Sequence, residues 1–527
     1  MISAEITDET VVELVALLGP DLREDGEAIL RRIADAAPER LAPALEGIFC
    51  GRALAGYRQE FLADMVLAYY LDEEEDGIHS HSYDEGVRGH QGFSLGAQMA
   101  AWYRGPFMPL FQTDFRNGVS ILNQILNHAA TVRARTLTGN DWYDGPVQDS
   151  DLDQYRIELG ITGAPHVYVG DAGTWNWYRR TGVGPYPCMS ALQALERVCD
   201  DIVELGVPLD VVIPMLLDGC DNVAMVGFVV GVLVRHLDKA GTLLDRFLAE
   251  PDVWHFEFGR VVHEYGGLRA SSEGIVGADR RGWSLREVAT SLVFAAGPER
   301  AEELRLVGQQ LVEKVRGHLE QLGDGVPAAA AELELSTARA WATCFDRSTY
   351  SVQETDDGFV IESHPPAEVT AVLSAGMSGV LRSQESMRLI VRYHVKQENG
   401  TAEPITTEDL VADLSSAVTL LDAQPELDAS GWDASAAVAA YALTQHFVHG
   451  LPLPDDSLKI AANIVLRVGE GDMPQRDHDI EAPYFSQGAE RSAARVLPLL
   501  LTPKADDVRR LLDGADGAAV YARAERP

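Results

Sequence analysis

The 527-residue sequence has few cysteines, and their spacing fits neither a metal site nor a redox centre. There are five cysteines, an odd number, and no two of them form a C-x-x-C pair. Zinc fingers, zinc ribbons and thioredoxin-like centres all need cysteines paired at short spacing. The sequence therefore excludes these classes, and we expect five buried thiols in a reducing compartment.

Long apolar runs are also missing. The most apolar segment, NVAMVGFVVGVLV at residues 222–234, is shorter than the ~18–20 residues that a membrane-spanning helix needs. The N-terminus, MISAEITDETVVELVALLGP, has neither the basic start nor the long apolar stretch of a secretory signal. We therefore expect a cytoplasmic protein that does not enter a membrane.

Positive charge is scarce. The chain has 43 Lys and Arg against 81 Asp and Glu, which gives a net charge of −38 at pH 7. A protein with this charge repels a phosphate backbone and an anionic lipid surface. The acidic composition therefore predicts no nucleic-acid partner and no membrane partner. The length predicts several domains or one extended repeat array, because a single core does not grow to this size.

What the sequence does contain is a succession of short amphipathic helices. In residues 190–208, SALQALERVCDDIVELGVP, apolar residues recur at helical spacing along one stripe. Ser190 stands three residues before a glutamine, which is capping-box spacing, and Gly206 with Pro208 marks the end. Asn222 is expected to open the strongly apolar helix that follows.

These patterns predict a mainly all-α protein. Short helices with short connections, each packing on its sequence neighbours, are typical of an α-solenoid of HEAT or armadillo type. No repeat of fixed period stands out, and repeats of this kind are commonly degenerate. The chain ends without an obvious polar capping helix, so the sequence leaves open whether it is part of a larger repeat array.

One departure from the helical pattern lies at residues 166–180, HVYVGDAGTWNWYRR. Alternating residues around two glycines predict a hairpin there. Trp175 and Trp177 would point to one side of its second strand, next to Tyr178. Exposed aromatic residues are enriched at protein interfaces, so these three residues are the predicted contact with a partner protein.

A second departure lies further along the chain. At residues 350–366 a D-D-G turn separates two alternating runs, and the segment after Arg388 has the composition of a further strand. We therefore expect a small β-containing insertion at residues 346–400. It would divide an N-terminal helical array, residues 1–345, from a C-terminal one, residues 401–527.

Several helical segments together resemble the helical region of large bacterial ATPases of the signal-transducing, STAND-like kind. The resemblance rests on the segments 103–129, 173–198, 221–236, 341–350 and 491–501. It implies a sensor or scaffold part of a bacterial signalling or antiviral defence system. Such proteins carry an NTPase module, but no G-x-x-x-x-G-K-[ST] loop occurs here. The resemblance therefore implies a partner NTPase subunit or domain on another chain.

The strongest candidate for chemistry is the acidic, histidine-bearing segment at residues 72–90. His79 and His81 would share one side of an extended strand, and Asp84 with His90 could complete a set of metal ligands. Three glycines and five consecutive acidic residues in the same segment favour a solvated loop instead. The loop is the preferred interpretation, and the metal site is the alternative.

Two hypotheses follow from the sequence. The first is a non-enzymatic helical-repeat scaffold or sensor that binds a partner protein and needs no cofactor. The second is an all-α metal-dependent enzyme that uses residues 72–90 to hydrolyse or ionise a small substrate. No H-E-x-x-H pair and no complete calcium-binding loop occurs in the sequence, which favours the first.

Overall fold

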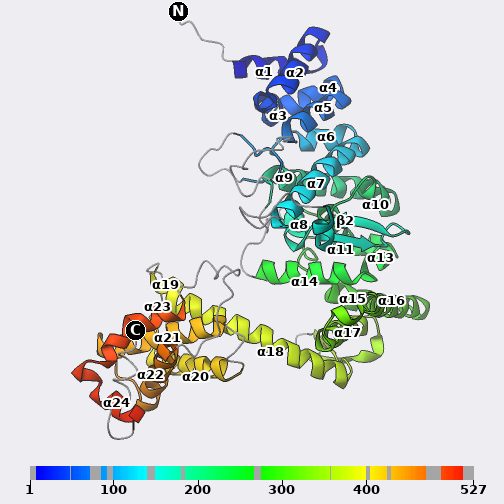
Figure 1. Ribbon diagram of the computed structural model, residues 1–527. Helices are drawn as coiled ribbons and strands as arrows, with labels where there is room; N and C mark the ends of the chain where they lie inside the picture. The colour runs from blue at the N-terminus through cyan, green and yellow to red at the C-terminus, as the bar shows by residue number, and fades with distance from the viewer. Residues whose placement is uncertain are drawn as a thin grey trace, which may run out of the picture. The chain divides into compact units, whose positions relative to one another are not determined.

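The computed structural model confirms that the protein is mainly helical (Figure 1). It divides into two compact units, Met1–Val369 and Thr370–Pro527. The residues that the structure describes are 8–47, 49–71, 85–91, 99–138, 149–179, 184–265, 274–355, 358–398, 404–423, 429–470 and 488–513.

The first unit consists of helices and two short hairpins. Most of its helices contact elements that are near them in chain order, such as α4 with α5 and α6, or α16 with α17. The helices are α1 (Asp8–Leu17), α2 (Glu24–Ala36), α3 (Ala42–Glu46), α4 (Cys50–Tyr57), α5 (Gln59–Tyr70), α6 (Phe107–Thr113), α7 (Phe115–Thr138), α8 (Ala172–Trp175), α9 (Tyr186–Glu204), α10 (Leu209–Leu217), α11 (Val223–Arg235), α12 (Leu237–Ala240), α13 (Asp245–Leu248), α14 (Pro251–Tyr265), α15 (Leu285–Ala295), α16 (Pro298–Leu322) and α17 (Ala328–Thr343). Short 3-10 turns connect them at η1 (Gly19–Asp21), η2 (Pro38–Leu41), η3 (Asp149–Tyr155), η4 (Asn176–Arg179), η5 (Gly323–Gly325) and η6 (Arg347–Thr349).

Helix α11 is the centre of the first unit's core, with α7, α8, α9 and α10 around it (Figure 1). As the sequence predicts, Asn222 caps this helix, because its side-chain oxygen accepts a hydrogen bond from the Met225 N–H at 2.8 Å. Val226 and Phe228 are 0 % and 1 % exposed. The helix is apolar on all sides because neighbours cover all sides, not because it enters a membrane.

The hairpin near residues 166–180 forms earlier in the chain than predicted. Strands β1 (Arg156–Leu159) and β2 (His166–Val169) pair antiparallel, with Arg156 opposite Val169. After β2 the chain turns into α8 because Asp171 caps that helix, accepting a hydrogen bond from the Thr174 N–H at 2.8 Å. The prediction of a strand through residues 172–180 is therefore wrong for the part described.

The segment 346–400 is shared between the two units. The predicted hairpin is confirmed, since β3 (Tyr350–Thr355) pairs antiparallel with β4 (Gly358–Ser363). The strand predicted after Arg388 is wrong, because α18 (Ala367–Ile390) continues there into a π-helical turn, η7 (Val391–Val395). The β-branched residues that suggested a strand pack on a helical face instead, with Ile390 only 4 % exposed.

The second unit is a small helical bundle with its own core. Its central helix, α21, contacts α20, α22 and α23. Many buried alanines on α21 let these neighbours approach closely. Besides most of α18, the unit contains α19 (Lys396–Glu398), α20 (Thr407–Ala423), α21 (Ala429–Phe447), α22 (Asp455–Glu470), α23 (Ala489–Leu500), η8 (Pro503–Ala505) and α24 (Asp506–Asp513).

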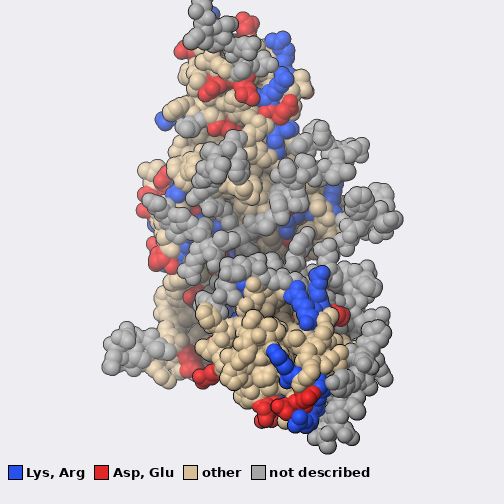
Figure 2. Space-filling view, turned by 90° about the vertical axis from the view of Figure 1, so that its left-hand side faces the viewer, with Lys and Arg blue, Asp and Glu red and all other residues tan. Residues whose placement is uncertain are grey.

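The surface carries both signs of charge. On the face that Figure 2 shows, the Lys and Arg side chains drawn do not join into one continuous basic surface. Among the described residues, no helix has the length and apolar character to cross a membrane.

Candidate functional site

The three residues predicted to contact a partner lie in the core of the first unit. Trp175 and Trp177 are 0 % exposed and Tyr178 is 4 % exposed. A side chain must reach solvent to contact another protein, so the expected exposure is contradicted. Two glycines of α11 explain the burial, because a Cβ at Gly227 would lie 3.0 Å from the Trp175 ring and one at Gly231 would lie 2.7 Å from the Tyr178 ring.

These aromatic residues border a buried ionic network. The Trp175 indole N–H donates to Glu257 at 2.9 Å, and Arg260 donates to the same carboxylate at 2.9 and 3.0 Å. Arg260 and Arg179 also both donate to Glu264, each at 2.9 Å through one guanidinium nitrogen. Burial alone would raise the pKa of Glu264, but the hydrogen bond and charge of Arg179 and the charge of Arg260 hold it below its usual value. The network therefore keeps the Glu264 carboxylate ionised inside the core.

The histidine segment predicted as the alternative metal site is only partly described. His79, His81 and Asp84 lie outside the described residues. His90 is described, and its side chain is 2 % exposed. The expectation of a solvated imidazole is wrong for this residue. Within the described ranges, no group of three or more His, Cys, Asp and Glu side chains is arranged to hold a metal ion.

The His90 imidazole instead lies between two polar side chains from distant parts of the chain. Its Nε2 is 3.0 Å from the Ser190 hydroxyl oxygen, and its Nδ1 is 3.4 Å from a Glu46 carboxylate oxygen. The Ser190 oxygen also accepts a hydrogen bond from the Ala101 N–H at 3.2 Å. The predicted capping role of Ser190 is therefore wrong: helix α9 begins at Tyr186, and the serine hydroxyl bonds across the core.

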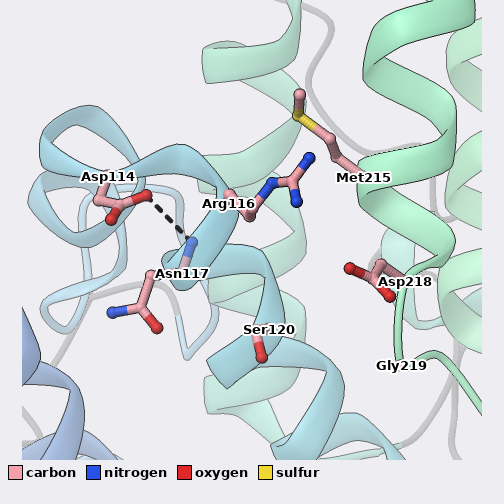
Figure 3. A pocket seen from close by; sticks show the side chains of 7 residues that line it. All are labelled: Asp114, Arg116, Asn117, Ser120, Met215, Asp218 and Gly219. Carbon is pink, nitrogen blue, oxygen red and sulfur yellow. Dashed lines mark hydrogen bonds between the residues drawn. The ribbon is translucent and has the colours of Figure 1, made fainter.

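A surface groove runs along α10, between α7 and α13. Two clefts of about 350 and 620 Å³ share Arg116, Met215 and Asp218 in their walls, so they adjoin each other, and together they are called the groove. The first cleft lies between the start of α7 and the end of α10 (Figure 3). The second continues past α10 to α13. The groove residues are Asp114, Arg116, Asn117, Ser120, Ile161, Thr162, Asp210, Val211, Ile213, Pro214, Met215, Leu217, Asp218, Gly219, Leu243, Arg246 and Phe247.

Local sequence explains how α7 presents its first turn to this groove. Asp114 caps the helix, since its carboxylate accepts a hydrogen bond from the Asn117 N–H at 3.1 Å (Figure 3). The cap fixes the direction in which the helix starts. The Arg116 side chain then extends from α7 toward α10, where Met215 and Asp218 lie (Figure 3).

The groove combines apolar lining with two positively charged side chains. Arg116 and Arg246 are exposed, and within the described residues neither guanidinium forms a hydrogen bond or an ion pair. The lining of the same cleft includes Ile213, Leu243 and Phe247. The exposed carboxylates Asp114, Asp210 and Asp218 also line the groove. An apolar segment of another protein can bind on such a surface, and acidic groups of that segment can pair with the two arginines.

A proline contributes a backbone acceptor to the same surface. Pro214 lies inside α10 and has no N–H. The Asp210 carbonyl therefore lacks the hydrogen bond that residue 214 would normally donate within the helix. Asp210 also lines the groove, so its carbonyl is a candidate acceptor for an N–H from a bound peptide.

No protein-family model matches the chain, and no curated protein matches it either. The groove residues therefore have no assigned role from relatives. Sequence reasoning did not identify them, although the proline at position 214 inside an otherwise helical run was the available signal.

Proposed function

We propose that this protein is a helical scaffold or sensor that binds a partner protein in the groove between α7, α10 and α13. The observation that carries the proposal is the pair of exposed guanidinium groups of Arg116 and Arg246, which have no partner among the described residues and lie beside apolar lining. Arginine is enriched among the residues that contribute most to protein interfaces, because its planar group binds carboxylates with two hydrogen bonds.

The proposed partner segment is apolar with at least one acidic side chain. Its apolar groups would cover Ile213, Leu243 and Phe247, and its carboxylate would pair with Arg116 or Arg246. A peptide fits better than one small molecule, because the two clefts adjoin each other along α10. The lining also holds Asp114, Asp210 and Asp218, so the acidic side chain must lie at the arginines and away from these three carboxylates.

The proposal extends to architecture and context. We infer that the first unit's helices are arranged as an α-solenoid of HEAT or armadillo type, supported by helices that contact near neighbours in chain order. The resemblance to STAND-like ATPases supports a signalling or antiviral defence context, with the NTPase on another polypeptide. In that setting the groove would receive a segment of the NTPase partner.

Selection from a random peptide library displayed on phage tests the groove directly. We expect enriched peptides to combine apolar residues with an acidic one and to lose binding to Arg116→Glu/Arg246→Glu. The matched control is Arg23→Glu/Arg52→Glu, which changes the net charge equally at two exposed arginines outside the groove. Selection that enriches nothing, or peptides that bind both variants alike, would reject the groove as the binding site.

A further inference from the structure

Three side chains are arranged as a nucleophile, a base and an orienting carboxylate: these are Ser190, His90 and Glu46, in that order. The Ser190 oxygen lies 3.0 Å from His90 Nε2, which is within direct proton-transfer distance. His90 Nδ1 lies 3.4 Å from Glu46 Oε1, on the opposite side of the ring. The three residues come from α3, the loop at 85–91 and α9, so only the fold brings them together.

The remaining hydrogen bonds are compatible with proton donation from Ser190 to His90. The Ala101 N–H donates to the Ser190 oxygen, so the serine's own proton is free to point to His90 Nε2. His90 Nδ1 then carries its proton toward Glu46. The carboxylate is held in place by two further donors, the Tyr69 hydroxyl at 2.9 Å and the Gln91 N–H at 3.1 Å. This is the tautomer that a serine nucleophile requires.

A buried tyrosine borders this cluster, with its hydroxyl beside Gly105. The Tyr70 hydroxyl is buried and has no hydrogen-bond partner in the described part of the chain. Its ring packs edge-on to the His90 ring at 6.0 Å between centroids. Burial raises the pKa of Tyr70 well above its usual value, so the phenol keeps its proton and remains a donor. An unused buried donor costs free energy unless something accepts its proton.

We propose that Ser190 is an activated nucleophile that takes an acyl group from a small carboxylic ester, with His90 as the base and Glu46 as a positioning residue. The Ser190 oxygen attacks the carbonyl carbon while its proton moves to His90 Nε2. The carbon–alkoxy bond then breaks, and the alkoxide leaves with the proton from His90. Water, deprotonated by His90, hydrolyses the acyl-serine and releases the carboxylic acid.

The burial of the cluster limits the substrate. Ser190 is 0 % exposed, so only a small acyl group can reach it, and only when the cluster opens locally. The activity is therefore independent of the groove at α10. Reversal of charge at Arg116 and Arg246 should leave it unchanged, which separates a failure of this inference from a failure of the proposed function.

Diisopropyl fluorophosphate is the probe, because it is small and forms a serine–phosphorus bond with loss of fluoride. Intact mass should show one adduct on the full-length protein, and peptide mapping should place it on Ser190. Ser94 must be distinguished, because residues 92–96, GFSLG, have the G-x-S-x-G spacing of a nucleophile motif and lie outside the described residues. The adduct should therefore persist in Ser94→Ala and vanish in Ser190→Ala.

The roles of His90 and Glu46 are tested by the rate of labelling. His90→Gln and Glu46→Gln should each slow labelling at least tenfold at an unchanged melting temperature, and Glu46→Asp should restore part of the rate. Two separate variants guard against one of them failing to fold. An adduct on Ser94, no adduct on Ser190, or a labelling rate that neither variant lowers would overturn the inference and leave the cluster as a tether between α3, α9 and the loop at 85–91.

Discussion

Replacing Arg260 by methionine should strongly destabilise the first unit. The Arg260 side chain is 2 % exposed and donates to Glu257, to Glu264 and to the Trp283 carbonyl. Methionine keeps much of the apolar volume but removes the charge. Glu264 keeps Arg179 as a partner, whereas Glu257 would keep only the neutral donors Trp175 and Tyr178.

An uncompensated carboxylate in the core costs about 3–5 kcal/mol when its partner is removed. For a unit of this size that loss corresponds to a fall of about 4–6 °C in the melting temperature. Circular dichroism and tryptophan fluorescence during denaturation measure the change. Adding Glu257→Gln to Arg260→Met should recover much of the loss, because glutamine keeps an acceptor for Trp175 and removes the buried charge.

The matched control is Arg305→Met. Arg305 also pairs with a glutamate three residues away on a helix, but its side chain is 42 % exposed and that of Glu302 is 56 % exposed. Solvent screens this pair, so the melting temperature should not change. If Arg260→Met destabilised the protein no more than Arg305→Met, the inference that the buried network holds the first unit together would be refuted.

Three further predictions concern the same core. The pKa of Glu264 is lower in the folded protein than in the unfolded chain. Its contribution to stability is therefore present above pH ~4.5 and should be lost as the pH falls through the folded pKa. Glu264→Gln should remove this part of the acid dependence of the unfolding free energy. Val226→Asp should cost roughly 3–5 kcal/mol because it buries an unpaired charge, whereas Val211→Asp, at a position 43 % exposed, should change the denaturation midpoint little. Burial raises the pKa of the Cys220 thiol to about 12, and it also raises the pKa of the other four thiols. Ellman's reagent should therefore react with all five much faster after unfolding than before. Fast reaction of the native protein would contradict this.

Elements with a strong local signal could be predicted from the sequence. The apolar helix after Asn222 forms as expected, because an asparagine cap and a run of apolar residues act within a few residues of each other. The β3–β4 hairpin is also confirmed, since its turn and its alternation are both local. The strand predicted after Arg388 is wrong because β-branched residues suit a helix when other helices cover them.

The surroundings of individual side chains depended on contacts that no local pattern contains. Trp175 and Trp177 are two residues apart, which suggested one face of a strand, yet Asp171 starts a helix and Gly227 opens space for the indole. His90 and Ser190 are 100 residues apart, so their hydrogen bond could not be predicted from spacing. The groove likewise joins α7, α10 and α13, and its apolar residues are indistinguishable in sequence from core residues.

The most direct test of the central claim is the affinity of one selected acidic, apolar peptide for the full-length protein, measured by fluorescence anisotropy. We expect Arg116→Glu/Arg246→Glu to raise the Kd at least tenfold, because each lost charged hydrogen bond is worth about 1.5–3 kcal/mol. Arg23→Glu/Arg52→Glu should leave the Kd within about twofold, since both residues are remote from the groove. An equal Kd for wild type and the groove variant, or an equal rise in the control, would contradict binding at this groove.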